Sequence, residues 1–165
     1  MRTVQLELSV PGRTPAEAYA TLADFGRYAD FAPAVRSVTV THAGDHTTVS
    51  RWEVNFRRGI LRWVEEDTFD PVEHRIRFRQ LEGDIALFEG SWSCIADEGG
   101  TRIVFDARLD MGIPSLADAL EPIAARTLVE NTAAIVSGIF LGASSLDRVL
   151  LDGIAQSPAR VEVGS

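Results

Sequence analysis

The chain has 165 residues, 45% of them hydrophobic and 24% charged, with a formal net charge of −8 at pH 7. This length fits one domain with a single core, and the composition is typical of a soluble globular protein. The acidic balance argues against a nucleic-acid partner, because neutralising phosphates requires a basic surface. A single cysteine, Cys94, excludes an internal disulfide and is expected as a small buried side chain.

No apolar run reaches the length of a membrane span, and the first ten residues alternate where a signal peptide would be continuously apolar. We therefore expect a cytoplasmic protein. The chain also lacks glycine-rich nucleotide-binding motifs, the nucleophile elbow of hydrolases and a Cys/His cluster suited to zinc. Neither a metal nor a cofactor is implied.

The N-terminal segment predicts one strand followed by two short helices. Apolar residues alternate through TVQLELSV, which indicates a strand over residues 3–10. The following TPAE supplies a helix N-cap, a proline at the first helical position and a glutamate that completes a capping box. The segment DFGRYADFAP predicts a second short helix that ends at Pro33.

Alternating patterns separated by turn residues then predict six consecutive strands, near 35–42, 46–56, 60–70, 74–82, 86–97 and 101–110. After the break MGIPS, a long helix is expected from about Ser115 to Asp152, with a short first turn or a kink at Pro122. We expect residues 1–152 to form one domain and 153–165 a flexible tail. The fold class is α+β: an antiparallel sheet of about seven strands curved around the C-terminal helix, enclosing a packed core or a cavity.

The turns also predict the register of the sheet. With Arg57 and Arg58 at a hairpin tip, Trp52 faces Trp63, and the alternation continues through the later turns. Opposite charges then face each other on the outer side, whereas a one-residue slip would invert both faces. The predicted inner face comprises Trp52, Val54, Phe56, Leu61, Trp63, Phe69, Ile76, Phe78, Trp92, Ile103, Phe105 and Leu109.

Glu65 and Asp67 share this aromatic inner face. A buried carboxylate without a partner costs several kcal/mol, so its pKa rises and it keeps its proton at higher pH. Such a group suits general acid–base chemistry, for example moving a proton next to a carbonyl or assisting loss of water. Alternatively, the sheet frays there and both acids reach solvent or pair with an arginine.

Two amides lie in similar positions. Asn131 falls on the apolar stripe of the long helix, where it could hold a ligand carbonyl or bond to a strand backbone group. Gln80 on the inner face has the same two interpretations. Trp52, Trp63 and Trp92 either fill a core or form a cavity wall on which a flat ligand could stack.

The motifs DFGRYADFAPAV, W-V-x-x-D-x-x-D-P, F-x-x-x-E-G, G-x-W and G-G-T resemble the START-related polyketide cyclase/dehydrase and coenzyme Q-binding superfamily, over about residues 3–145. The segment RWVEEDTFDPVEHRIRFRQLEG most resembles bacterial aromatic polyketide aromatase/cyclases. The resemblance implies a helix-grip fold and cofactor-independent aldol ring closure and dehydration of a poly-β-ketone, a step of antibiotic biosynthesis. Carriers share the fold, so the fold alone does not choose between an enzyme and a binding protein.

Carried over residue by residue, the resemblance matches Asn131 to a cavity asparagine of the last helix. Asp67 and Gln80 stand at or near places where the family has arginines, and Phe31 stands where a tyrosine is expected. The loss of two guanidinium groups and a phenol would change how an enolate is stabilised.

The first hypothesis is a polyketide cyclase or aromatase/cyclase in which Asp67, with Glu65 and Asn131, carries the chemistry. The substrate would lie against Trp52, Trp63, Phe78, Trp92, Gln80, Phe31 and Phe105. An acyl carrier protein could deliver it by meeting Arg57 and Arg58. The alternatives are a non-catalytic carrier of a quinone, lipid or polyketide, and a structural protein with a filled core. A homodimer through the outer sheet face or the long helix stays open.

Overall fold

The computed structural model describes residues 1–56, 59–112, 114–140, 145–152 and 154–156 of the chain. Its strands are β1 (Arg2–Pro11), β2 (Val35–Gly44), β3 (Thr47–Phe56), β4 (Gly59–Asp70), β5 (Arg75–Gly83), β6 (Leu87–Asp97), β7 (Gly100–Asp110), β8 (Ser145–Leu151) and β9 (Ile154–Gln156). Its helices are α1 (Pro15–Ala23), the 3-10 turn η1 (Phe25–Arg27), α2 (Tyr28–Phe31) and α3 (Pro114–Ile139).

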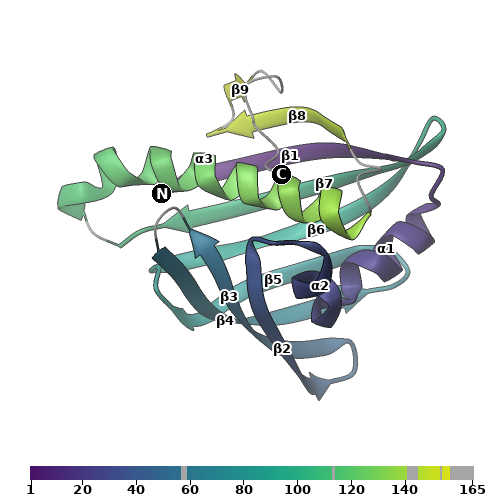
Figure 1. Ribbon diagram of the computed structural model, residues 1–165, viewed down its shortest axis with the longest axis horizontal. Helices are drawn as coiled ribbons and strands as arrows, with labels where there is room; N and C mark the ends of the chain where they lie inside the picture. The colour runs from purple at the N-terminus through teal and green to yellow at the C-terminus, as the bar shows by residue number, and fades with distance from the viewer. Residues whose placement is uncertain (57–58, 113, 141–144, 153, 157–165) are drawn as a thin grey trace.

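The nine strands of the described residues belong to one antiparallel sheet in the order β2-β3-β4-β5-β6-β7-β1-β8-β9. The sheet curves around α3, and α1 and α2 lie at one end of the molecule (Figure 1). The core lies between the inner face of the sheet and the helices. This is the helix-grip arrangement that the sequence predicts, with the sheet wrapped around a C-terminal helix.

The capping box at the start of α1 is present as predicted. Thr14 Oγ1 accepts a hydrogen bond from the backbone N–H of Glu17 at 3.2 Å. Glu17 Oε1 accepts one from the N–H of Thr14, also at 3.2 Å. These two bonds satisfy backbone donors that a helix N-terminus leaves without partners, and they fix where the chain turns from β1 into α1.

The predicted register is confirmed across the sheet. Trp52 lies opposite Trp63, and Asp67 lies opposite Phe78. The pairs Glu53–Arg62, at 3.1 Å, and Glu66–Arg79, at 3.2 Å, lie on the outer face. The alternation in sequence therefore separates the two faces of β3, β4 and β5 correctly.

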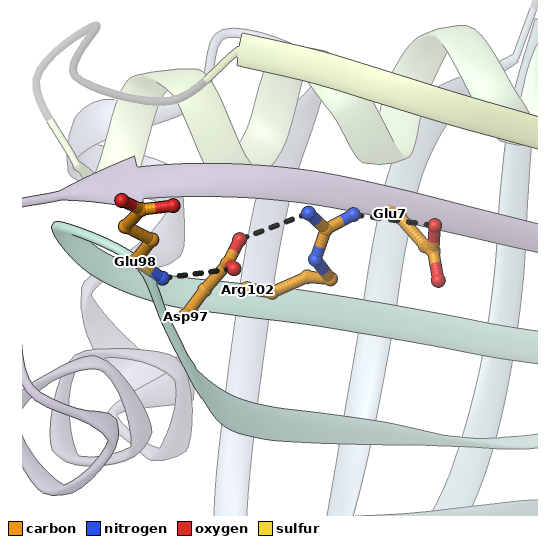
Figure 2. Close-up of polar contacts among 4 residues, drawn as sticks. All are labelled: Glu7, Asp97, Glu98 and Arg102. Atoms are coloured by element: carbon orange, nitrogen blue, oxygen red, sulfur yellow. Dashed lines mark hydrogen bonds and ion pairs between the residues drawn. The ribbon is translucent and has the colours of Figure 1, made fainter.

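A second outer-face network joins β7 to its neighbours. The Arg102 guanidinium contacts Asp97 at 2.9 Å and Glu7 of β1 at 3.4 Å (Figure 2). Asp97 also accepts a hydrogen bond of 2.9 Å from the backbone N–H of Glu98 in the β6–β7 turn. Because the network is partly exposed, it contributes little stability on its own and mainly specifies the pairing.

The expected extent of the last helix is wrong. The helix ends at Ile139 rather than near Asp152, and residues 145–151 form β8 against the free edge of β1. Leu146 and Val149 have a spacing that fits a helical stripe but also a short apolar strand, so periodicity alone could not decide. Pairing with β1 covers an edge that would otherwise present unpaired backbone groups.

Within the segment expected as a flexible tail, residues 154–156 form β9 against β8. Residues 157–165 lie outside the described part of the chain. None of the described helices is long and apolar enough to cross a membrane.

Candidate functional site: an aromatic cavity with a buried carboxyl pair

A cavity lies between α3 and the inner face of the sheet. Its volume is about 90 Å³, measured as space for the centre of a water molecule. One water needs on the order of 10–15 Å³ by this measure, so the cavity is more than a packing defect. Its wall is mostly aromatic and aliphatic, and consists of Phe25, Tyr28, Trp52, Val54, Phe56, Leu61, Trp63, Glu65, Phe78, Ile85, Phe88, Trp92, Phe105, Leu109, Met111, Ala124, Leu128, Asn131, Thr132 and Ile135.

The structure brings most of the sequence-predicted site residues into this wall. Those that line it are Trp52, Trp63, Glu65, Phe78, Trp92, Phe105 and Asn131. Asp67, Gln80 and Phe31 do not line it. The order of the two acids is therefore reversed relative to the sequence hypothesis: Glu65 faces the cavity, and Asp67 lies behind it.

Glu65 is the carboxyl group that a ligand would meet. Its side chain is only 4% exposed, and its Oε1 accepts a hydrogen bond of 3.1 Å from the indole N–H of Trp63. The other side of Glu65 faces Asp67, which is two residues along the same face of β4 and within hydrogen-bonding reach. Strand geometry thus places two carboxyl groups side by side in an apolar wall.

Asp67 is fully buried, and its carboxyl group is held by side chains of β3. Its Oδ2 accepts hydrogen bonds from the hydroxyls of Ser50, at 2.6 Å, and Thr48, at 2.9 Å. Ser50 in turn accepts a hydrogen bond of 2.8 Å from the indole N–H of Trp52. These donors favour the ionised form of Asp67 and fix the position of its carboxyl group.

The two carboxyl groups differ in how readily they ionise. Burial raises the pKa of Glu65 well above its ordinary value of 4.5, and the charge of Asp67 raises it further. Burial also raises the pKa of Asp67, but hydrogen bonds from its neighbours lower it in part. When the pair holds one proton, that proton therefore resides mainly on Glu65.

The hydrogen bonds available to Asp67 also support a proton on Glu65. Asp67 Oδ1 is buried and has no donor partner among the described groups as long as both carboxyls are ionised. A proton on Glu65 supplies the missing donor. An unpaired buried oxygen would otherwise cost about 1–3 kcal/mol.

Asn131 has the structural role that the sequence offers as one of two, and its other role, holding a ligand, stays a prediction. Its amide N–H donates to the backbone carbonyl of Asn55 at 2.9 Å, which joins α3 to β3. The side chain also lines the cavity, where it is half-buried. Its Oδ1 has no partner in the part of the chain that the structure describes, so this oxygen remains available to a ligand.

Gln80 and Phe31 lie elsewhere. The Gln80 amide donates to the Ile85 carbonyl at 2.5 Å, which fixes the β5–β6 turn rather than a ligand. Phe31 packs beneath the guanidinium of Arg27 beside a separate surface hollow. The hypothesis that these two residues contact substrate thus has no geometric support in this structure.

The aromatic wall is built from stacked pairs. Trp52 and Trp63 are parallel within 2°, with ring centroids 5.6 Å apart. Phe78 and Phe105 are within 10° of parallel at 5.9 Å. Offset stacks of this kind hold the rings rigidly, so the cavity presents flat, preformed surfaces.

Ser50, Thr48 and Tyr28 are among the residues of the site that the sequence did not indicate. Ser50 and Thr48 face inward opposite Glu65 and Asp67, a position that the predicted hairpin register already implied. Tyr28 is buried in the cavity wall, and its hydroxyl donates to the Leu22 carbonyl at 2.5 Å. The sequence pattern of the short helix around Tyr28 does not indicate that this side chain is buried in the cavity wall.

The remaining predictions concern residues away from the cavity wall. Burial raises the pKa of the Cys94 thiol to about 12, so it is inert as a nucleophile at neutral pH. Arg57 and Arg58, the expected carrier-protein contact, lie outside the described residues. Among the residues that the structure describes, no cluster of three His, Cys, Asp or Glu side chains could hold a metal ion.

The fold is shared with several solved structures. The protein TTHA0849 from Thermus thermophilus is 25% identical with a TM-score of 0.77, covering 86% of this chain and 96% of that one. The Zhui aromatase/cyclase from Streptomyces sp. R1128 is 21% identical with a TM-score of 0.73, covering 86% and 93%. A START superfamily protein from Mycobacterium smegmatis is 16% identical with a TM-score of 0.68, covering 84% and 96%.

No curated protein matches the sequence. The model of one family does: polyketide cyclase / dehydrase and lipid transport, over residues 11–136. That match covers most of the chain, from the end of β1 well into α3, and includes both carboxyl groups of the cavity pair. The chain therefore belongs to the polyketide cyclase / dehydrase and lipid transport family.

Proposed function

We propose that this chain is a cofactor-independent polyketide cyclase or aromatase/cyclase, with the Glu65–Asp67 pair as its acid–base group. One observation carries the proposal: a buried carboxyl group, whose pKa is raised by burial well above its ordinary value, faces a mostly apolar cavity. A pure binding site for an apolar ligand would gain nothing from that burial, because burying a carboxyl group destabilises the fold.

Two carboxyl groups that share one proton can both donate a proton and accept one. With the proton on Glu65, the pair is an acid at the cavity wall; with the proton moved to Asp67, Glu65 is a base at the same place. A carboxyl pKa raised toward neutral is also near the optimum for proton transfer at physiological pH.

Ring closure and dehydration need both states. In ring closure, Glu65 as carboxylate removes a proton from a carbon between two carbonyls, and that carbon bonds to a distant carbonyl carbon. The carbonyl oxygen then takes the proton back. In dehydration, the base removes a neighbouring C–H proton, a C=C bond forms, and the hydroxyl leaves with a proton as water. Neither step requires an oxidant or a reductant.

In this proposal, the cavity wall folds the poly-β-ketone chain of the substrate. The stacked pairs of Trp52 with Trp63 and Phe78 with Phe105 offer flat walls, and the available Oδ1 of Asn131 can accept a hydrogen bond from an enol. Holding two reacting carbons of one chain near each other turns a promiscuous condensation into one favoured ring closure.

A non-catalytic carrier of a quinone, lipid or polyketide is the second candidate. The observation that favours it is the composition of the cavity wall, in which Glu65, Asn131 and Thr132 are the main polar side chains. Such a wall would retain an apolar ligand without any chemistry.

Product analysis separates the two. A reconstituted synthesis of a poly-β-ketone is run without this protein, with the wild-type protein and with Glu66→Gln, and products are identified by mass spectrometry. Glu66 neighbours Glu65 but pairs with Arg79 on the outer face. Glu66→Gln therefore removes a carboxyl group next to the pair without changing the cavity wall, and serves as the control variant. The proposal expects a new cyclised, dehydrated product with both proteins. An unchanged product profile, with a poly-β-ketone bound to the wild-type protein, would favour the carrier.

A further inference from the structure

A second hollow lies outside the cavity, at the end of the molecule where α1, α2 and the end of α3 meet. Its volume is about 320 Å³, and its lining includes Arg13, Thr21, Asp24 and Arg27. Tyr28 lines both this hollow and the cavity, so it is the wall between them. The acid–base site described above uses none of the polar groups of this hollow.

Both arginines of the hollow rest on aromatic rings. The guanidinium carbon of Arg13 lies 5.6 Å from the ring centre of Phe140, and that of Arg27 lies 5.0 Å from the ring centre of Phe31. Contact with a ring face immobilises the guanidinium but leaves its N–H groups, which point outward in its own plane, free to donate. Both guanidinium groups therefore lie over ring faces, and the Arg27 side chain remains 64% exposed to solvent.

The charges around the hollow are only weakly paired, with Arg13 close enough to Glu17 for its charge to contribute to the lowered pKa of that carboxyl group. Within the described part of the chain, Arg13 makes no ion pair, and Arg27 has only Asp24, whose Oδ2 is 4.0 Å from Arg27 Nε and forms no hydrogen bond with it. Two arginines and one aspartate leave the hollow with a net positive charge, on a protein whose formal charge is −8. A cationic hollow on an acidic surface is a site for an anion.

We propose that this hollow binds the phosphate group of an organic phosphate, held by the in-plane N–H groups of Arg13 and Arg27. Planar guanidinium groups match the oxygens of a phosphate in geometry as well as in charge, which lysine does not. The phosphate could belong to a free phosphate ester or to the phosphopantetheine arm of a carrier protein. This site does not depend on the acid–base role of Glu65.

The test is calorimetric titration of the full chain with inorganic phosphate at about 150 mM salt, where long-range attraction is screened. Arg13→Gln and Arg27→Gln should each weaken binding about tenfold, the loss of a charge-assisted hydrogen bond. Arg51→Gln removes an exposed arginine on β3, away from the hollow, and should change nothing. Asp24→Asn removes the carboxylate that competes for Arg27 and should tighten binding.

Two double variants separate charge from geometry. Arg13→Gln with Arg27→Gln removes both cations and should abolish binding, whereas Arg13→Lys with Arg27→Lys keeps the charge and removes the guanidinium planes. Loss of binding in the lysine variant supports recognition by those planes, and unchanged binding there would overturn it. Unchanged binding in the glutamine double variant would overturn the site. Melting temperatures equal to that of the wild type establish that each variant is folded.

The same titration distinguishes the sources of the phosphate. Phosphopantetheine binding more tightly than inorganic phosphate, with pantetheine alone not binding, supports the carrier arm as the source. Equal affinity for phosphopantetheine and inorganic phosphate supports a free phosphate ester. Binding of pantetheine as tightly as phosphopantetheine would contradict a phosphate site altogether.

Discussion

Glu65 and Asp67 occupy successive inward positions of β4, so their carboxyl groups cannot avoid each other. Because their surroundings differ, we expect the two carboxyl groups to have different roles. Glu65 has one hydrogen bond from an indole and an open side toward the cavity, whereas Asp67 has two hydroxyl donors and no access to the cavity. Pairs of acids whose environments push their pKa values apart are the usual basis of acid–base assignments.

Replacing Asp67 with Asn tests how the pair shares its proton. The Asp67 charge and hydrogen bond both raise the pKa of Glu65, so the variant lowers the pKa of Glu65, and burial alone keeps it above 4.5. We expect the alkaline limb of the pH–rate profile of kcat/KM to move to lower pH, with turnover reduced at pH 7 and ligand binding little changed. An unshifted limb would mean that Asp67 does not control the proton on Glu65.

The pair also makes stability depend on pH. The folded pKa of Glu65 is raised above its unfolded value, so its contribution is fully present below about pH 4.5 and declines as pH rises toward the folded value. Each pH unit in that window costs about 1.4 kcal/mol of unfolding free energy relative to an uncharged group. Urea unfolding of wild type and Glu65→Gln from pH 5 to pH 8 should show the wild type losing stability relative to the variant, and parallel curves would refute the raised pKa.

At the scale of elements, the sequence predicted the six strands from β2 to β7 with their register, because one aromatic face and one charged face alternate through short, recognisable turns. It could not predict how far each inward-facing side chain lies from the cavity. Alternation says that Asp67 and Gln80 face inward, but not that Asp67 lies behind Glu65 or that the Gln80 amide turns onto the Ile85 carbonyl. It also missed β8, since only the free edge of β1 decides between helix and strand there.

The contact between α2 and α3 depends on a glycine. A Cβ added at Gly138 would overlap the backbone oxygen of Phe31, a contact that neither backbone can relieve without moving. Gly138→Ala should therefore destabilise the protein by about 1–3 kcal/mol through overpacking, although alanine favours helices.

Gly26→Ala is the control for this prediction. A Cβ at Gly26 would meet nothing within 4 Å, so its stability should stay within about 0.5 kcal/mol of the wild type. Chemical denaturation of both variants is the measurement. A Gly138→Ala variant as stable as Gly26→Ala would show that α3 does not rest on α2 as described.

At the scale of the whole molecule, the fold forms two separate hollows, a cavity between α3 and the sheet and a surface hollow where α1, α2 and the end of α3 meet. The cavity is apolar with a single proton-carrying pair, and the hollow beside α1 and α2 is cationic, with Tyr28 between them. Whether the protein forms a homodimer through the outer sheet face or α3 stays a prediction from the sequence, as does contact of a carrier protein with Arg57 and Arg58.

The most direct test of the central claim is a single-turnover measurement with Glu65→Gln. Glutamine keeps the size of the side chain but can neither give up nor take a proton, so binding of a poly-β-ketone, followed by tryptophan fluorescence, should stay within a few-fold of wild type. Conversion of the bound substrate should slow by about 100-fold or more, the usual contribution of one acid–base group. Conversion at the wild-type rate would contradict the assignment of chemistry to this pair.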